Sequence, residues 1–310
     1  MVTIIFPIES NYLNESQSLS GCVALIGATN AGKSTLINRF VGAKVSIVTH
    51  KVQTTRWVVR GIISNKNSQI VFLDTPGIFL ANDSYHKLMV KSSWNTVNFA
   101  DIVLLIVDSN RGFKPDIYDI FKEIKKRSNR LVLVLNKIDC VKPEHLLKQA
   151  KIANELLSIE RTFMISATKG HGCDDVLNYL YSALPCGPWI YPEDQISDLP
   201  MSRFAAEITR EKLFLHLHKE IPYASYVATE KWEERKDGSV LIRQIIYVER
   251  VNQKKIILGK NGQIIKIISS ESRQEIAKII EKTVHIFIFV KVQKDWGNNM
   301  RSLSQIGIEL

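Results

Sequence analysis

The chain has 310 residues, with 41 lysines and arginines against 31 aspartates and glutamates, and 45% of its residues are hydrophobic. This length is sufficient for two domains, and the composition excludes disordered and fibrous proteins. No apolar run approaches the roughly 18 residues that a membrane span needs. The first residues lack the features of a signal peptide, and the four scattered cysteines are expected to be free thiols of a cytosolic protein. The formal net charge of +10 suggests a polyanionic partner without identifying it.

We expect a flexible leader over residues 1–19 and a first domain over residues 20–185. Short apolar runs alternate with helical patterns through this domain. Strands are expected at 22–26, 57–63, 69–73, 102–107, 131–135 and 163–165. Helices are expected at 35–41, 86–99, 115–126, 143–159 and 172–184. Such alternation predicts an α/β domain in which helices cover both faces of a parallel sheet.

Four of the nine prolines lie between Pro185 and Pro200. Each proline fixes φ and interrupts helices, so residues 186–200 are predicted to be a semi-rigid linker. The pattern then changes to a smaller α+β domain over residues 201–310. Its expected elements are a helix at 204–220, strands at 223–234 and 240–250, helices at 254–258 and 263–282, and a strand at 284–292. The first of these helices is expected to be amphipathic, with Phe204, Ile208 and Leu215 in line on its apolar face.

The segment G-A-T-N-A-G-K-S, from Gly27 to Ser34, lies between the first strand and the first helix. This is the context of a phosphate-binding loop, in which backbone N–H groups and the helix N-terminus bind phosphate oxygens. A lysine adds positive charge and a serine hydroxyl binds Mg²⁺. The expected phosphate contacts are Gly27, Asn30, Ala31, Gly32, Lys33, Ser34 and Thr35.

Two further segments are expected to respond to the third phosphate of a nucleotide. Asp74-Thr75-Pro76-Gly77 follows a strand, where the carboxylate can hold a Mg²⁺-bound water and the glycine N–H can face the γ-phosphate. A threonine of Gln53-Thr54-Thr55-Arg56 can complete the Mg²⁺ shell. The predicted Mg²⁺ ligands are Ser34, Thr55 and, through water, Asp74.

Asn136-Lys137-Ile138-Asp139 and Ser166-Ala167 also follow strands and predict guanine binding. The aspartate can accept hydrogen bonds from N1–H and the 2-amino group of guanine, which adenine does not offer. A backbone N–H of Ser166-Ala167 would reach the guanine oxygen. The ordered set of motifs predicts a GTPase that uses GTP, GDP and Mg²⁺.

Two residues bear on the mechanism. Ile78 stands where Ras-like GTPases have the glutamine that orients the attacking water, so intrinsic hydrolysis should be slow. Asn30 can reach the phosphate groups or a monovalent cation, or it can simply stabilise the turn. These two roles for Asn30 remain open on physical grounds.

In the second domain, Gly259-Lys260-Asn261-Gly262 joins two helices within an α-β-β-α-α-β order. This matches the G-x-x-G loop of KH domains, whose backbone clamps four nucleotides of single-stranded RNA. The alternative is a solvated basic face. Besides the tetrapeptide itself, the residues expected at the RNA are Lys254, Lys255 and Lys266.

The chain from about residue 21 onwards resembles the Era family of bacterial GTPases. The resemblance is carried by G-A-T-N-A-G-K-S-T, K-V-Q-T-T-R, D-T-P-G, N-K-I-D and S-A, then by R-E-K-L (210–213), V-E-R, Q-K-K and the G-x-x-G. Related tRNA-modifying and tandem-domain GTPases have the first half of this set without the second. Thr29 replaces a proline that is usual in the family, and Lys260-Asn261 reverses the usual N-K order.

The resemblance implies a GTPase that binds 16S ribosomal RNA near its 3′ end and assists maturation of the small (30S) ribosomal subunit. It also implies a hydrophobic residue at Ile78 and potassium binding by Asn30. We expect a cytoplasmic monomer, and the family adds peripheral contact with the inner membrane. The alternative is a translation-factor-like or regulatory GTPase that acts on a protein partner.

Overall fold

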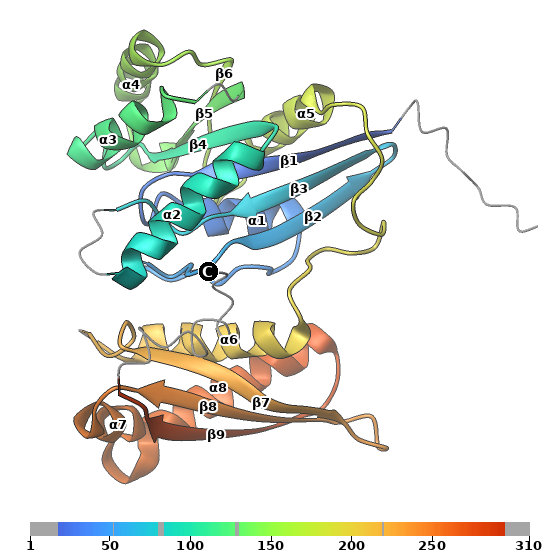
Figure 1. Ribbon diagram of the computed structural model, residues 1–310, viewed down its shortest axis with the longest axis vertical. Helices are drawn as coiled ribbons and strands as arrows, with labels where there is room; N and C mark the ends of the chain where they lie inside the picture. Colours follow the sequence, from blue (N-terminus) through green and yellow to red (C-terminus); the bar gives the residue numbers. More distant parts are fainter. Residues whose placement is uncertain (1–17, 52, 80–83, 128–129, 219, 295–310) are drawn as a thin grey trace, which may run out of the picture.

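The structure is a computed structural model, and it describes residues 18–51, 53–79, 84–127, 130–218 and 220–294. Figure 1 shows two domains, one above the other, joined by an extended connection over residues 185–200. The predicted leader lies almost wholly outside the described residues. The first strand begins at Leu19.

The first domain is built on a six-stranded sheet in the order β2-β3-β1-β4-β5-β6. The strands are β1 (Leu19–Ile26), β2 (Val59–Asn65), β3 (Ser68–Asp74), β4 (Ile102–Asp108), β5 (Arg130–Asn136) and β6 (Arg161–Met164). Five of them are parallel, as expected, but β2 is antiparallel to β3. Only two residues separate this pair, and a parallel partner would need a crossover of about a dozen residues.

Helices cover both faces of this sheet, as predicted. They are α1 (Lys33–Val41), α2 (Ser84–Phe99), α3 (Pro115–Ile124), α4 (Pro143–Leu156) and α5 (Cys173–Ala183). Val23 and Leu25 of β1 pack in the cluster formed with α1 and α5, while Ala24 and Ile26 pack in the cluster formed with α2, α3 and α4. Successive residues of a strand point to opposite faces, so a strand covered on both faces must be apolar throughout.

The connection over residues 185–200 is bonded to the first domain rather than free of it. The side-chain oxygen of Gln69 accepts hydrogen bonds from the backbone N–H groups of Ile190 and Tyr191, at 2.8 and 2.9 Å. The N–H of Ile62 donates to the carbonyl of Ile196 at 2.9 Å. These bonds position the start of the second domain relative to the first sheet.

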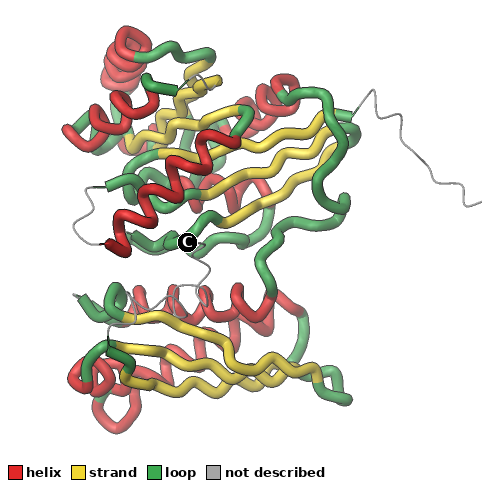
Figure 2. The backbone as a smooth tube through the Cα atoms, viewed as in Figure 1, coloured by secondary structure: helices red, strands yellow, loops and turns green. Residues whose placement is uncertain are grey.

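The second domain has a three-stranded sheet in the order β7-β8-β9, in which β8 and β9 are parallel. Its elements are α6 (Met201–His216), β7 (Ser225–Glu234), β8 (Val240–Val248), α7 (Val251–Leu258), α8 (Gln263–Ile280) and β9 (Val284–Val292). The predicted α-β-β-α-α-β order is correct. Helices α6 and α8 lie against the same face of the sheet (Figure 2).

Helix α6 differs from its prediction in one informative way. We expected Phe204, Ile208 and Leu215 on one apolar face, but Leu215 is 47% exposed. Almost every residue from Phe204 to Phe214 is buried instead, including charged ones. The helix lies between the second sheet and the first domain, as Figure 1 shows, so it has no fully solvated face.

The four cysteines are free thiols, as predicted. Among the described residues, no helix combines the length and the apolar character that a membrane span requires.

Candidate functional site

The loop between β1 and α1 can be formed only by glycine at two positions. A Cβ atom on Gly27 would lie 2.2 Å from the carbonyl oxygen of Ile106. Gly32 has φ of +98°, and a Cβ there would lie 2.2 Å from Nδ2 of Asn136. The loop therefore curls against the end of the sheet and leads directly into the N-terminus of α1, where anions are stabilised.

Lys33 is the first residue of α1, and only 5% of it is exposed. Its ammonium group donates to the carbonyl oxygens of Gly27 and Ala28, at 3.2 and 3.0 Å. Burial lowers the pKa of Lys33 to about 8, and the nearby carboxylate of Asp74 opposes this shift. A bound phosphate would favour the charged form still further, so the lysine is placed to respond to a nucleotide.

The predicted Mg²⁺ ligands lie together. The hydroxyl oxygens of Ser34 and Thr55 are 3.0 Å apart, and Ser34 donates to a carboxylate oxygen of Asp74 at 2.7 Å. Ser46 donates to the same oxygen, whereas Oδ1 of Asp74 is buried with no hydrogen-bond partner among the described residues. Burial raises the pKa of Asp74, and Lys33 lowers it.

This set of oxygens fits Mg²⁺. Two adjacent ligands of an octahedral Mg²⁺ ion, each bound at about 2.0–2.1 Å, lie about 3 Å apart, as the hydroxyls of Ser34 and Thr55 do. The unpartnered oxygen of Asp74 can accept from a metal-bound water. Mg²⁺ bound here would neutralise charge on the phosphate oxygens.

The D-T-P-G segment packs against the phosphate loop. A Cβ atom on Gly77 would lie 2.8 Å from Cα of Thr29, and the N–H of Ile78 donates to the carbonyl of Gly27 at 3.1 Å. The side chain of Ile78 packs against an apolar cluster. Because it is a hydrocarbon, it has no donor or acceptor that could orient a water molecule. The hydroxyl of Thr75 donates to Leu25, and the carbonyl of Pro76 accepts from Ser93.

These segments surround a cavity of about 570 Å³. Phosphate-loop residues line part of it, and residues 47–50 and 53–55 line another part. Lys137 and Thr168, from the predicted base-binding loops, lie at its border. Leu215 of α6 also lines this cavity, so the second domain contributes to its wall.

The residues of the predicted guanine motifs divide into buried residues, which hold loops together, and exposed residues. Asn136 is buried and joins neighbouring loops. Its side-chain nitrogen donates to the carbonyl of Ala31 at 2.8 Å, and its side-chain oxygen accepts from the N–H groups of Lys137 and Ala167. We expected a backbone N–H of Ser166-Ala167 at the guanine oxygen, but the N–H of Ala167 donates to Asn136 and that of Ser166 donates to the carbonyl of His171 at 3.0 Å. Ser166 is almost fully buried.

Asp139, in contrast, is exposed to solvent, two residues after Lys137, which lines the cavity. A hydrogen bond from Ser166 is the main cause that lowers the pKa of Asp139, and Lys169 contributes from 3.7 Å. The carboxylate is thus ionised and can accept two hydrogen bonds from guanine. Lys137 adopts a left-handed conformation and bonds through its ammonium group to Asp108 at 2.6 Å.

Sequence reasoning did not identify the contacts between residues 44–57, here called the switch segment, and the second domain. Lys44 pairs with Glu211 and Glu275, and the N–H of Val48 donates to Glu211. The side chains of Lys51 and Arg56 donate to backbone carbonyl oxygens of the second domain, namely those of Phe214, Leu217, Pro222, Tyr223 and Ser225. The available signal was the set of basic residues around K-V-Q-T-T-R together with the unassigned R-E-K-L.

The G-x-x-G loop lies on the surface of the second domain. Gly259, Asn261 and Gly262 all have positive φ, at 72°, 52° and 74°. Lys260 and Asn261 are exposed, as are Lys255 and Lys266, while Lys254 is half-buried. The loop therefore presents backbone and cationic groups to solvent, as an RNA clamp requires.

The fold and both sites define a P-loop GTPase followed by a KH domain. A family described as 50S ribosome-binding GTPase matches residues 22–137, and the KH domain family matches residues 220–297. GTPase Era of Agrobacterium fabrum is 60% identical over 296 residues, covering 96% of this chain and 93% of that protein. GTPase Era of Sinorhizobium medicae is 60% identical over 290 residues, covering 94% of each.

Two crystal structures are also similar over almost the whole chain. Era in complex with MgGDPNP and nucleotides of 16S ribosomal RNA has a TM-score of 0.90 and 34% identity, covering 94% of this chain and all of that one. A variant of Aquifex aeolicus Era bound to GDP and AlF4⁻ has a TM-score of 0.89, 34% identity and the same coverage. The chain belongs to the Era family of GTPases.

Proposed function

We propose that this GTPase binds 16S ribosomal RNA near its 3′ end through the KH domain and assists maturation of the small ribosomal subunit. GTP binding and hydrolysis would switch its association with the RNA. The relative that binds such RNA has the same two-domain architecture over 94% of this chain. The observation that carries the RNA assignment is the exposed Gly259–Gly262 loop with its surrounding lysines.

The nucleotide site supports a more detailed proposal. Ser34 and Thr55 would bind Mg²⁺ directly, Asp74 would do so through water, and Asp139 would select guanine. Asn30 would bind K⁺ through its side-chain oxygen, because Asn30 lines the nucleotide cavity and its amide nitrogen is already bonded to the carbonyl of His50 at 2.9 Å. Neutral oxygens of this kind suit a monovalent cation.

A binding experiment tests the RNA assignment. The full chain is titrated against a labelled oligonucleotide with the sequence of the 16S 3′ end, once with a GTP analogue and once with GDP. We expect binding that weakens steeply with salt, because lysines contact phosphates, and a different affinity in the two nucleotide states. A hairpin duplex of the same composition should bind more weakly, because the loop recognises unstacked bases.

No binding in either nucleotide state would contradict the proposal and favour a GTPase that acts on a protein partner. Recovery of the 30S precursor with the protein from cell extracts would test the assembly role. We expect the protein to be a cytoplasmic monomer. Peripheral contact with the inner membrane, which the family implies, also remains a prediction.

A further inference from the structure

A buried arginine of the second domain contacts the switch segment of the first. Arg210 lies in the middle of α6, and only 1% of it is exposed. One of its terminal nitrogens donates to the carbonyl oxygen of Thr54 at 2.5 Å. Its Nε donates to Glu207 on the same helix at 2.8 Å, so the guanidinium is held in one orientation.

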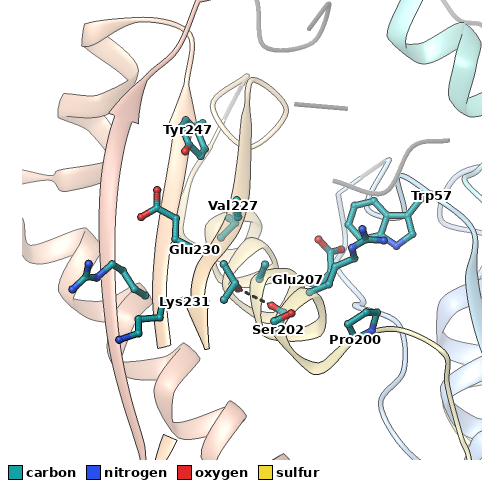
Figure 3. Close-up of a pocket in the computed structure, with 13 residues that line it drawn as sticks. Trp57, Pro200, Ser202, Glu207, Val227, Glu230, Lys231 and Tyr247 are labelled. Atoms are coloured by element: carbon teal, nitrogen blue, oxygen red, sulfur yellow. Dashed lines mark hydrogen bonds between the residues drawn. The ribbon is translucent and has the colours of Figure 1, made fainter. Parts of the chain in front are cut away.

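The rest of the guanidinium is enclosed by aromatic rings. Its central carbon lies 5.6 Å from the ring centre of Trp57 and 5.4 Å from that of Phe214. Figure 3 shows Trp57 and Glu207, one from each domain, at the same cavity of about 750 Å³ at the domain boundary. Arg210 therefore binds the switch segment at both a carbonyl and a ring.

Thr54 precedes the predicted metal ligand. Its hydroxyl is 2.7 Å from that of Thr49 and donates to the carbonyl of Lys51 at 2.9 Å, so its side chain is bonded within the switch segment. Thr55 then points its hydroxyl to within 3.0 Å of Ser34. Because the peptide unit between Thr54 and Thr55 is planar, holding the Thr54 carbonyl also limits where Thr55 can lie.

A buried arginine–glutamate pair is weak evidence of a purely stabilising role. Apolar residues of similar volume often replace such pairs without loss of stability. The planar guanidinium of arginine binds a carboxylate and a carbonyl in one fixed geometry, whereas the rotatable ammonium of lysine does not fix the angle between its two partners. The geometry thus favours a positioning role over simple packing.

We propose that Arg210 is a positioning residue for GTP hydrolysis: it holds the Thr54 carbonyl so that the Thr55 hydroxyl remains at the Mg²⁺ site. The second domain is then part of the GTPase site. Leu215, five residues further along α6, supports this because it lines the nucleotide cavity. The inference rests on the GTPase activity of the family and is independent of the proposed RNA target.

The test uses the full chain with Arg210→Lys and with the double variant Arg210→Met and Glu207→Gln. The double variant avoids leaving Glu207 buried without its partner. We expect single-turnover hydrolysis to fall by roughly 10- to 100-fold, as for other small displacements of reacting groups. The Mg²⁺ concentration for half-maximal binding of GDPNP should rise roughly 10-fold, as when a metal ligand loses its support.

GDP binding separates positioning from general damage, because Thr55 contacts Mg²⁺ only when the third phosphate is present. We expect the affinity for GDP to stay the same in both variants. Arg203→Met, on the same helix and at the same boundary cavity, should leave hydrolysis unchanged. Unaltered hydrolysis and Mg²⁺ dependence in folded variants would overturn the proposal, as would equal losses of GDP and GDPNP binding.

Discussion

The molecule has two glycine-bounded loops that lead into helices, and they differ in how tightly the surrounding structure holds them. In the phosphate loop, a Cβ atom on Gly32 would meet Asn136 at 2.2 Å, and Lys33 is 5% exposed. In the KH loop, a Cβ atom on Gly262 would meet nothing closer than 4.0 Å, and Lys260 is exposed. Both glycines nevertheless have positive φ.

The difference follows from what each loop is predicted to bind. A phosphate chain enclosed in a small cavity needs donors fixed on all sides, so the phosphate loop is packed against β4 and β5. A flexible RNA strand approaches from solvent and needs an accessible backbone. Substitutions at Gly32 should therefore affect both folding and nucleotide binding, while substitutions at the exposed Lys260 and Asn261 should affect RNA binding mainly.

The largest effect is expected from a matched pair of glycine substitutions. Gly32→Ala combines the strain of positive φ with a clash, so we expect GTP affinity to fall by at least roughly 100-fold. Gly262→Ala meets no neighbour, and we expect it to lower the free energy of unfolding by only about 1–2 kcal/mol. Urea denaturation measures the free energy of unfolding of each variant, and nucleotide titration measures its affinity for GTP. Equal losses of stability and of GTP affinity in the two variants would contradict the difference between the two loops.

The guanine-binding rim should give the next effect. Asp139→Asn replaces an acceptor by a donor opposite the 2-amino group, so GTP affinity should fall by about 30- to 100-fold while xanthine nucleotide binds better. Since Asp139 is exposed, thermal unfolding should not change. Competition binding with GTP, XTP and ATP measures the shift. Similar affinity for ATP and GTP in the wild-type protein would contradict guanine selection.

A variant that tests the G-x-x-G loop should leave the backbone of that loop intact. Gly259→Asp would strain the loop, since a Cβ atom there meets Ile264 at 2.7 Å. Lys260→Asp with Asn261→Asp keeps both glycines, and aspartate tolerates the positive φ of Asn261. We expect RNA affinity to fall roughly 10-fold, with GTP binding unchanged. Lys236→Asp, in the exposed β7–β8 turn, is the matched control and should retain RNA binding.

The smallest effect concerns Asn30, which bridges the phosphate loop and the switch segment. If it binds K⁺, replacing Na⁺ by K⁺ should raise the rate of GTP hydrolysis by less than about tenfold, because a monovalent ion contributes less than a directed donor. Asn30→Ala should remove that difference. Identical rates of the wild-type protein in both salts would leave Asn30 as a residue that stabilises the turn.

Patterns among residues close together in the sequence were sufficient to predict many of the strands and the binding loops of this protein. The apolar runs of β1, β4 and β5 predicted buried strands because a strand covered on both faces has no polar position. Phosphate-binding residues could be recognised because Gly27 to Ser34 are contiguous and their backbone performs the function. The G-x-x-G was recognisable for the same reason, once the order of the surrounding elements was read.

Contacts between distant segments could not be read in this way. Nothing near Asn136 in the sequence shows that it would join the phosphate loop to Ala167 rather than face the base. Leu215 looked like a core residue because its spacing was helical, yet it lines the nucleotide cavity. Spacing along one helix reports a shared face but does not say what lies opposite.

The class of each domain, the phosphate and guanine motifs and the KH loop could all be derived from residues that are adjacent in the chain. The packing of the whole molecule was needed to show that α6 lies between the domains, that Arg210 reaches Thr54 across 156 residues, and that the switch segment is bonded to the second domain. A buried donor must find an acceptor, but which acceptor it finds depends on how the whole chain packs.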